Sequence, residues 1–78
     1  MSEKELSFGE KAVGLTLNNP SDDAHVTEIK KGFAAVIDVL NDLRDDTISG
    51  EKKRLYSAAI TEAQIAQMLG VKAVTWID

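Results

Sequence analysis

The sequence has no cysteine and only one histidine among its 78 residues. Disulfide bonds are therefore excluded, and a lone histidine without cysteine strongly disfavours a structural zinc site. A chain of this length buries little surface on folding, and small domains usually compensate with disulfides, metals or assembly. Assembly is the device that remains, so the sequence predicts a homo-oligomer.

Long apolar runs and an excess of positive charge are also missing. No run reaches the roughly 18 apolar residues of a membrane-spanning helix, and the first residues lack the apolar core of a secretory signal. We therefore expect a soluble protein of the cytoplasm. The formal net charge of −4 disfavours binding to DNA or RNA polymers, because such proteins carry a basic footprint. Local basic clusters at Lys30–Lys31 and Lys52–Arg54 remain suited to a small anion.

Groups for catalysis are scarce as well. His25 lies among acidic residues at an expected helix start, where a capping or solvated role is common. Acidic pairs such as Asp22 with Asp23 also fall at helix starts or in a turn, where caps and solubility explain them. No metal-ligand spacing and no phosphate-cradling glycine loop is present. The sequence thus predicts a binding protein, not an enzyme, with no metal and no cofactor.

The dominant feature of the chain is residues 49–76, which we interpret as one long helix with more apolar surface than a single partner could cover. One row alternates steps of four and three residues, as a coiled-coil seam does. That row consists of Leu55, Ala59, Glu62, Ala66, Leu69, Ala73 and Trp76. Other faces carry Ala58, Ile60, Ile65, Met68, Val71 and Val74. We expect Leu69 to lie in a core and the helix to need several neighbours.

Polar residues are embedded in the same helix, namely Thr61, Glu62, Gln64 and Gln67. Two interpretations stay open for them. They face solvent or fix the register of the helix, or some of them line a polar cavity between subunits.

A first long helix is predicted over residues 20–45, preceded by an arm at residues 1–19. Its seam residues, spaced by threes and fours, are Val26, Ile29, Phe33, Val36, Leu40 and Leu43, with Ile37 widening the stripe. Asn19 or Ser21 can cap this helix, and Pro20 is tolerated in its first turn. The arm fits no clean period, so we expect an irregular segment with a short helical turn.

The segment DDTISG at residues 45–50 separates the two long helices, and Thr47 or Ser49 can cap the second one. Because so short a connection makes the helices antiparallel neighbours, the predicted fold is all-α. It is a single domain over residues 1–78: an antiparallel helical hairpin after an irregular or partly helical arm, assembled as a homo-oligomer.

Two basic clusters are candidate anion sites. Lys30 and Lys31 are adjacent and so point about 100° apart on a helix, although such a pair is more often a solvated lysine flank. Lys52, Lys53 and Arg54 fall in a first helical turn, where cations oppose the helix dipole. Arg54 can make a bidentate contact to a phosphate.

Several motifs together resemble a known family. They are Gly9-Glu10-Lys11, Asn19-Pro20-Ser21, Ile29-Lys30-Lys31, Glu51-Lys52-Lys53-Arg54, and TEAQIAQM followed by VKAVTW within residues 61–76. Over Gly9 to Trp76 the chain resembles the small bacteriophage helical-hairpin proteins, which include anti-CBASS cyclic-nucleotide sponges and related anti-Thoeris sponges. The resemblance implies a homohexamer in the host bacterial cytoplasm during infection. It would capture cyclic di- and trinucleotide messengers of bacterial immunity and hold them undegraded.

The resemblance also implies site residues. Cyclic dinucleotides would bind between two subunits, at Asn18, Asn19, Ser21, Lys30 and Lys31. Just before Asn-Pro-Ser, where a stacking aromatic residue is expected, this chain has Leu17-Asn18-Asn19. Cyclic trinucleotides would bind on threefold axes at Arg54, Ser57 and Thr61, whose spacings of three and four place them on one helical face.

Two alternatives remain open from the sequence. The first is a structural or regulatory helical-hairpin protein that binds a protein partner through the apolar face of the second helix. Nucleotides would not stabilise such a protein. The second is a small nucleic-acid-binding accessory protein, which the acidic net charge disfavours.

Overall fold

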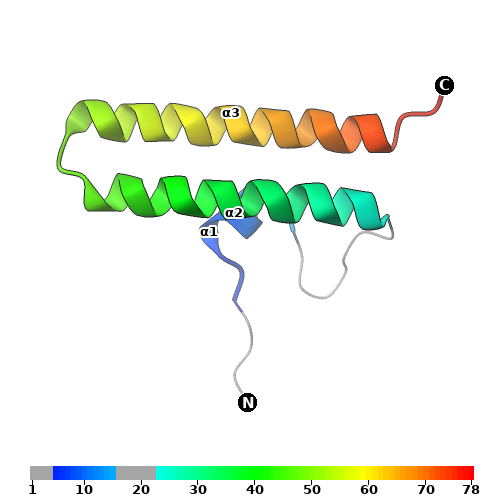
Figure 1. Cartoon of the computed structure of the whole chain (residues 1–78), viewed down its shortest axis with the longest axis horizontal. Coiled ribbons are helices and arrows are strands. Elements are labelled where there is room, and N and C mark those ends of the chain that lie inside the picture. The colour runs from blue at the N-terminus through cyan, green and yellow to red at the C-terminus, as the bar shows by residue number, and fades with distance from the viewer. Residues whose placement is uncertain (1–4, 16–22) are drawn as a thin grey trace, which may run out of the picture.

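The computed structural model describes residues 5–15 and 23–78, and this part of the chain forms three helices and no strand. They are α1 (Phe8–Ala12), α2 (Ala24–Asp46) and α3 (Gly50–Val74). The two long helices lie side by side and antiparallel, and α1 packs against α2 (Figure 1). The predicted all-α hairpin with a partly helical arm is therefore confirmed. None of the described helices is long and apolar enough to cross a membrane.

Side-chain caps explain where the long helices begin. Asp23 caps α2, with its carboxylate accepting a hydrogen bond of 2.8 Å from the His25 amide. The sequence predicts Asn19 or Ser21 as this cap, and that prediction is wrong for the helix that forms. Both of those residues lie outside the described ranges. Aspartate caps as well as asparagine or serine, so residue type alone cannot choose among the three positions.

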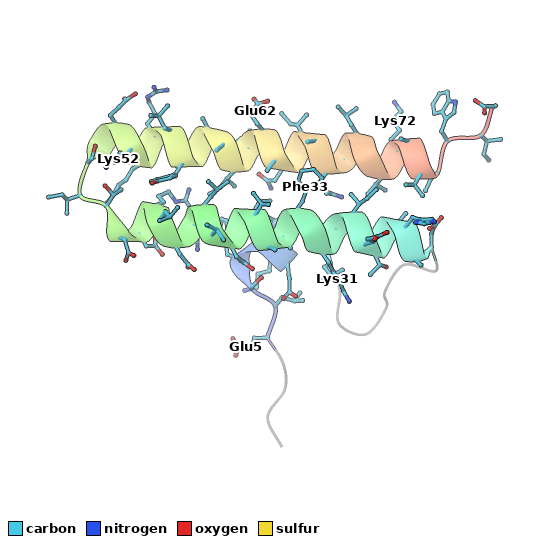
Figure 2. All side chains as sticks on the ribbon, viewed as in Figure 1. Glu5, Lys31, Phe33, Lys52, Glu62 and Lys72 are labelled. Atoms are coloured by element: carbon cyan, nitrogen blue, oxygen red, sulfur yellow. The ribbon has the colours of Figure 1, made fainter. Side chains whose placement is uncertain are left out.

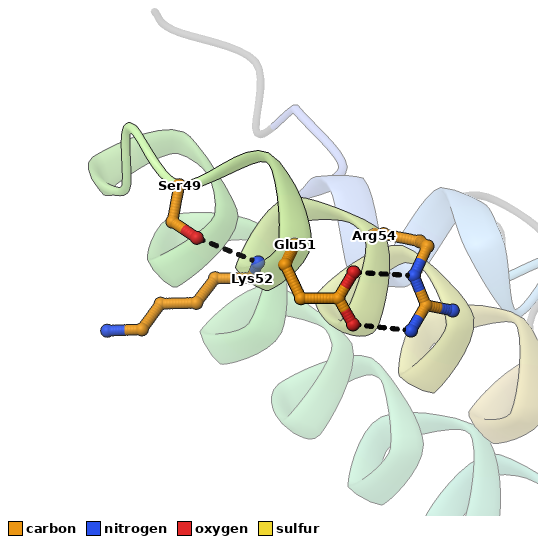
Figure 3. Close-up of polar contacts among 4 residues, drawn as sticks. All are labelled: Ser49, Glu51, Lys52 and Arg54. Atoms are coloured by element: carbon orange, nitrogen blue, oxygen red, sulfur yellow. Dashed lines mark hydrogen bonds and ion pairs between the residues drawn. The ribbon is translucent and has the colours of Figure 1, made fainter.

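The connection between the long helices is closed by the two hydroxyl residues that the sequence nominated. Ser49 caps α3, because its Oγ accepts from the Lys52 amide at 3.2 Å (Figure 3). Thr47 ends α2, and its Oγ1 accepts from the Ser49 amide at 3.1 Å. These bonds satisfy backbone groups in the tight turn and direct α3 back along α2.

The core centres on Ile37, which is completely buried. The other buried members of this cluster are Val13, Ala34 and Ile60. The predicted α2 seam is partly wrong, since Val36 is 52% exposed and Leu43 43% exposed. The reason is that α2 is covered on two sides, by α1 and by α3, so its buried sector is rotated towards Ala34.

The exposed row of α3 is the one that the sequence analysis placed in a seam. Within the single chain Leu55, Leu69 and Trp76 are 51%, 61% and 63% exposed, so the expectation that Leu69 lies in the core is wrong here. Figure 2 shows Glu62 and Lys72 pointing away from α2. The buried and half-buried row begins one residue later, with the same alternating spacing: Tyr56, Ile60, Ala63, Gln67, Gly70 and Val74. A shift of one residue rotates the packed face by about 100°.

A close backbone approach fixes α1 across α2. Gly9 is buried, and a Cβ atom there would overlap the carbonyl oxygen of Ala34. The Gly9 amide donates a 2.7 Å hydrogen bond to the Asp38 carboxylate. The guanidinium of Arg44 lies 5.5 Å from the centre of the Phe8 ring. Gly9, Asp38 and Arg44 together fix the position of α1 on α2.

Candidate functional site

The two candidate lysines of α2 lie in different surroundings. Lys30 is half-buried and lines a cleft of about 420 Å³ between the end of α1 and the two long helices. The cleft is lined by Lys11, Ala12, Val13, Gly14, Lys30, Gln64, Gln67, Met68 and Val71. Lys31 is exposed, lines a separate hollow with His25 and Glu28, and points away from α3 (Figure 2). Of the two, Lys30 has the setting of a binding residue.

One wall of the cleft is the turn that ends α1. The Gly14 amide donates to the Lys11 carbonyl at 3.1 Å, and the Leu15 amide donates to the Glu10 carbonyl at 2.9 Å. These two bonds make a Schellman motif, which needs a residue with positive φ, and Gly14 has φ of 75°. The Lys30 ammonium lies 4.0 Å from the position that a Cβ atom on Gly14 would occupy. The positive φ is thus what requires glycine here, and a Cβ atom would lie at an ordinary contact distance from this cation.

The opposite wall comes from α3 and combines amides with apolar side chains. The Gln64 amide donates to the Ala12 carbonyl at 3.2 Å, which ties α3 to the end of α1. Gln67 is only 5% exposed, and no residue of the described ranges hydrogen-bonds its side chain. Met68 and Val71 complete the wall. A cation, an amide and an apolar surface together suit an anion that carries a flat ring.

The remaining candidates of the first set are Asn18, Asn19 and Ser21, which lie outside the described residues. Among the five residues that the resemblance nominated for a dinucleotide, the structure thus places Lys30 in the cleft and Lys31 on another side of α2. It also brings in Lys11, Gln64 and Gln67, which the resemblance did not nominate.

The second candidate set lies on the first half of α3. Arg54 is exposed, and its guanidinium donates two hydrogen bonds to Glu51, from Nε at 3.0 Å and from Nη2 at 2.6 Å (Figure 3). These bonds hold the pKa of the Glu51 carboxyl below its ordinary value and raise the pKa of Arg54. A phosphate that binds Arg54 must therefore replace Glu51 or share the guanidinium with it.

The other two members of that set differ in exposure. Ser57 is half-buried, and its Oγ accepts a 3.0 Å hydrogen bond from Nη1 of Arg44. Thr61 is exposed, and its Oγ1 donates to the Ser57 carbonyl at 3.2 Å. The hydroxyl of Ser57 thus supports the contact between α2 and α3, while Arg54 and Thr61 remain open to solvent.

Sequence reasoning did not assign a role to Arg44 or single out Gln67. Arg44 joins three elements, since it bonds Asn41 and Ser57 and lies over the Phe8 ring, and no sequence pattern pointed to it. Gln67 did carry a signal, because it is a polar residue at a regular position of a row that is otherwise small or apolar apart from Tyr56. Sequence reasoning left its role undecided between register and cavity.

The family model of the Acb2/Tad1 hairpin domain matches residues 10–75 of the chain. This range contains α2, α3 and every residue that lines the Lys30 cleft. The chain belongs to the Acb2/Tad1 hairpin family. Acb2/Tad1 proteins are phage sponges that bind cyclic nucleotides and are not enzymes. Neither the curated proteins nor the solved structures include a significant match.

Membership of the Acb2/Tad1 family confirms the resemblance stated from the sequence motifs. It also indicates that cyclic nucleotides are the ligands with which the two candidate sites should be compared. Cyclic nucleotides carry phosphodiester anions and flat bases, which are the groups that the cations, amides and apolar wall described above can contact.

Proposed function

We propose that this protein is an anti-CBASS sponge that binds and sequesters cyclic dinucleotide messengers, cyclic trinucleotide messengers or both, without degrading them. The family match over residues 10–75 carries the proposal. The Lys30 cleft supports it, because capture without turnover needs a preformed pocket with a few well-placed polar groups.

For cyclic dinucleotides, the proposed phosphodiester contact is the Lys30 ammonium. Its half-buried position beside Gly14 favours it over exposed Lys31, because a partly desolvated cation interacts more strongly with an anion. Asn18, Asn19 and Ser21 remain proposed contacts from the neighbouring loop.

For cyclic trinucleotides, the proposed contacts are Arg54, Ser57 and Thr61. In the proposed arrangement copies of Arg54 meet around a symmetry axis, where they would repel one another when the pocket is empty. The ion pair with Glu51 offsets that repulsion, since it places a negative charge 2.6 Å from each guanidinium. An incoming phosphate then exchanges with Glu51.

The proposed assembly is a homohexamer that acts in the host bacterial cytoplasm during infection. Its support is the apolar surface that the single chain leaves uncovered, which includes Leu55 and Leu69 of α3 and Trp76 just beyond the end of α3. Burying such residues on other copies gives a short chain the apolar contacts that its own hairpin cannot supply. Sedimentation of the purified protein tests the hexamer, and a monomer at micromolar concentration would contradict it.

The test of function is thermal unfolding of the full chain with a panel of cyclic di- and trinucleotides. Their linear counterparts serve as controls. At 100 times the dissociation constant, one bound ligand adds about 2.7 kcal/mol to the free energy of unfolding. We expect a higher melting temperature with cyclic ligands, and chromatography of the heat-released ligand should recover it unchanged.

Cleaved ligand would contradict the sponge mechanism. An unchanged melting temperature across the panel would contradict capture altogether and would favour the alternative, a hairpin that binds a protein partner through α3.

A further inference from the structure

Gln67 is a buried polar residue that the hairpin itself does not use. It occupies the packed row of α3, with Ala63 before it and Gly70 after it at the same face. The residue is only 5% exposed, yet its amide has no hydrogen-bond partner within residues 5–15 and 23–78. The hairpin therefore gains no hydrogen bond from this amide, and an apolar side chain of the same shape could fill the same position.

A role in fixing helix register does not account for this residue. A polar group that sets register does so by pairing with a polar group across the seam, and the described residues provide no such pair for Gln67. Gln67 lines the Lys30 cleft. No side-chain nitrogen or oxygen of the described residues is both fully enclosed and unpaired, so the Gln67 amide retains some accessible surface. The unpaired amide is therefore available to a ligand in the cleft.

We infer that Gln67 reads the base of the bound nucleotide and selects adenine. A carboxamide places a donor and an acceptor side by side, which matches the N6 amino group and N7 of adenine. Guanine presents two acceptors, O6 and N7, on the same edge, and one of them would oppose the amide oxygen. This inference rests on the proposed capture of cyclic dinucleotides.

The rest of the cleft fits one nucleotide. Met68 and Val71 give an apolar wall for the ring, and the Lys30 ammonium, on the side of Gly14, is placed for the phosphodiester. The volume of about 420 Å³ lies near the lower end of the range for small-molecule pockets. One half of a cyclic dinucleotide therefore enters the cleft, and the other half stays outside it.

The test is calorimetric titration of the full chain with cyclic di-AMP and cyclic di-GMP. We expect the wild type to bind cyclic di-AMP more tightly. Gln67→Met keeps the shape of the side chain and removes the amide, so it should weaken cyclic di-AMP binding about tenfold and change cyclic di-GMP binding by less than about twofold. Lys30→Met should lower the affinity for cyclic di-AMP and for cyclic di-GMP by a similar factor, because a contact to a phosphate does not distinguish one base from another.

Two controls separate base reading from a structural role. Without ligand, Gln67→Met should melt at the same temperature as the wild type or higher, since the amide makes no hydrogen bond to the described residues that the substitution could break. Lys72→Met removes an exposed cation that points away from α2 (Figure 2) and should leave both affinities unchanged.

The outcomes distinguish the inference from the proposed function. Binding of both ligands by Gln67→Met at wild-type affinity, or with one common loss, would overturn base reading and leave the sponge function intact. A wild type that prefers cyclic di-GMP would overturn it without any variant. A wild type that binds neither ligand would refute the dinucleotide pocket, and the base-reading role with it.

Discussion

Lys30 and Lys31 are consecutive residues of α2, yet they line separate hollows on different sides of the helix. One helical residue corresponds to a rotation of about 100°, which turns Lys30 towards the cleft beside α3 and Lys31 away from it. Two neighbouring charges in the sequence are therefore not interchangeable as ligand contacts.

Alanine substitution separates these two lysines. Lys30→Ala should weaken cyclic dinucleotide binding by tenfold or more, because a charge-assisted contact contributes about 1.5–3 kcal/mol. Lys31→Ala should leave dinucleotide affinity close to that of the wild type, and both variants should keep trinucleotide binding. Calorimetry with both ligand classes measures this, and an equal loss in the two variants would contradict the assignment of Lys30.

Arg54→Ala should have the opposite effect on the two ligand classes to that of Lys30→Ala. It should weaken cyclic trinucleotide capture and leave cyclic dinucleotide capture unchanged, because Arg54 lies on the first half of α3 and is not among the residues that line the Lys30 cleft. The same calorimetric titrations test it. A loss of both ligands to the same extent would mean that the two pockets are not separate.

The contribution of the Glu51–Arg54 ion pair to stability should depend on pH. Hydrogen bonds from Arg54 hold the pKa of the Glu51 carboxyl below its ordinary value of 4.5. The pair's contribution to folding is therefore complete above pH 4.5 and is lost as the pH falls through the lowered pKa. NMR titration of the Glu51 carboxyl should give a pKa below 4.5 in the wild type. The value should return towards 4.5 in Arg54→Ala, and an unchanged value would show that Arg54 is not the cause.

Substitutions at Ile37 and Leu69 distinguish the core of the single chain from the contacts between subunits. Ile37→Ala should lower the free energy of unfolding by about 2–5 kcal/mol at any protein concentration, because the side chain is completely buried within one chain. Leu69 is 61% exposed in that chain, so Leu69→Ala should act through subunit contacts. Its effect should grow as the protein becomes more concentrated. Denaturant unfolding at several concentrations tests this, and a concentration-independent loss in Leu69→Ala would contradict it.

Alanine substitutions at Gly9 and Gly32 test how α1 is docked on α2. Gly9→Ala should destabilise the protein by about 1–3 kcal/mol, because the added methyl group overlaps the Ala34 carbonyl. Gly32→Ala meets no neighbouring atom within 4 Å and lies inside α2, so it should stabilise by about 0.5–1 kcal/mol. Thermal unfolding compares the two variants. Equal effects would show that the contact between Gly9 and Ala34 does not constrain α1.

The hairpin could be predicted from the sequence because its signals are local. The turn at residues 45–50 carries its own caps, and Ser49 and Thr47 form the hydrogen bonds that their residue types suggest. The choice of face on α3 could not be predicted. Two rows one residue apart share the same spacing, and which of them packs depends on contacts with α2 that the α3 pattern does not encode. Leu69 was misplaced for this reason.

The binding cleft was predictable only in part. Lys30 was found through its motif, although the sequence could not separate it from Lys31. The roles of Gly14 and Gln67 depend on distances between the turn after α1 and a helix about fifty residues later. Neither the composition nor the spacing of apolar residues indicates which segments far apart in the sequence come into contact.

The docking of α1 has a consequence for binding rates and affinity. A helix of 5 residues is not stable alone in water, so the cleft wall at its C-terminal end exists only while α1 is docked on α2. The hydrogen bond from the Gly9 amide to Asp38 is one of the contacts that dock it. Measured affinity is the intrinsic affinity multiplied by the fraction of chains in that docked state. A substitution at Asp38, which is not among the residues that line the cleft, should thus slow ligand capture while the escape of bound ligand from the docked state keeps its rate.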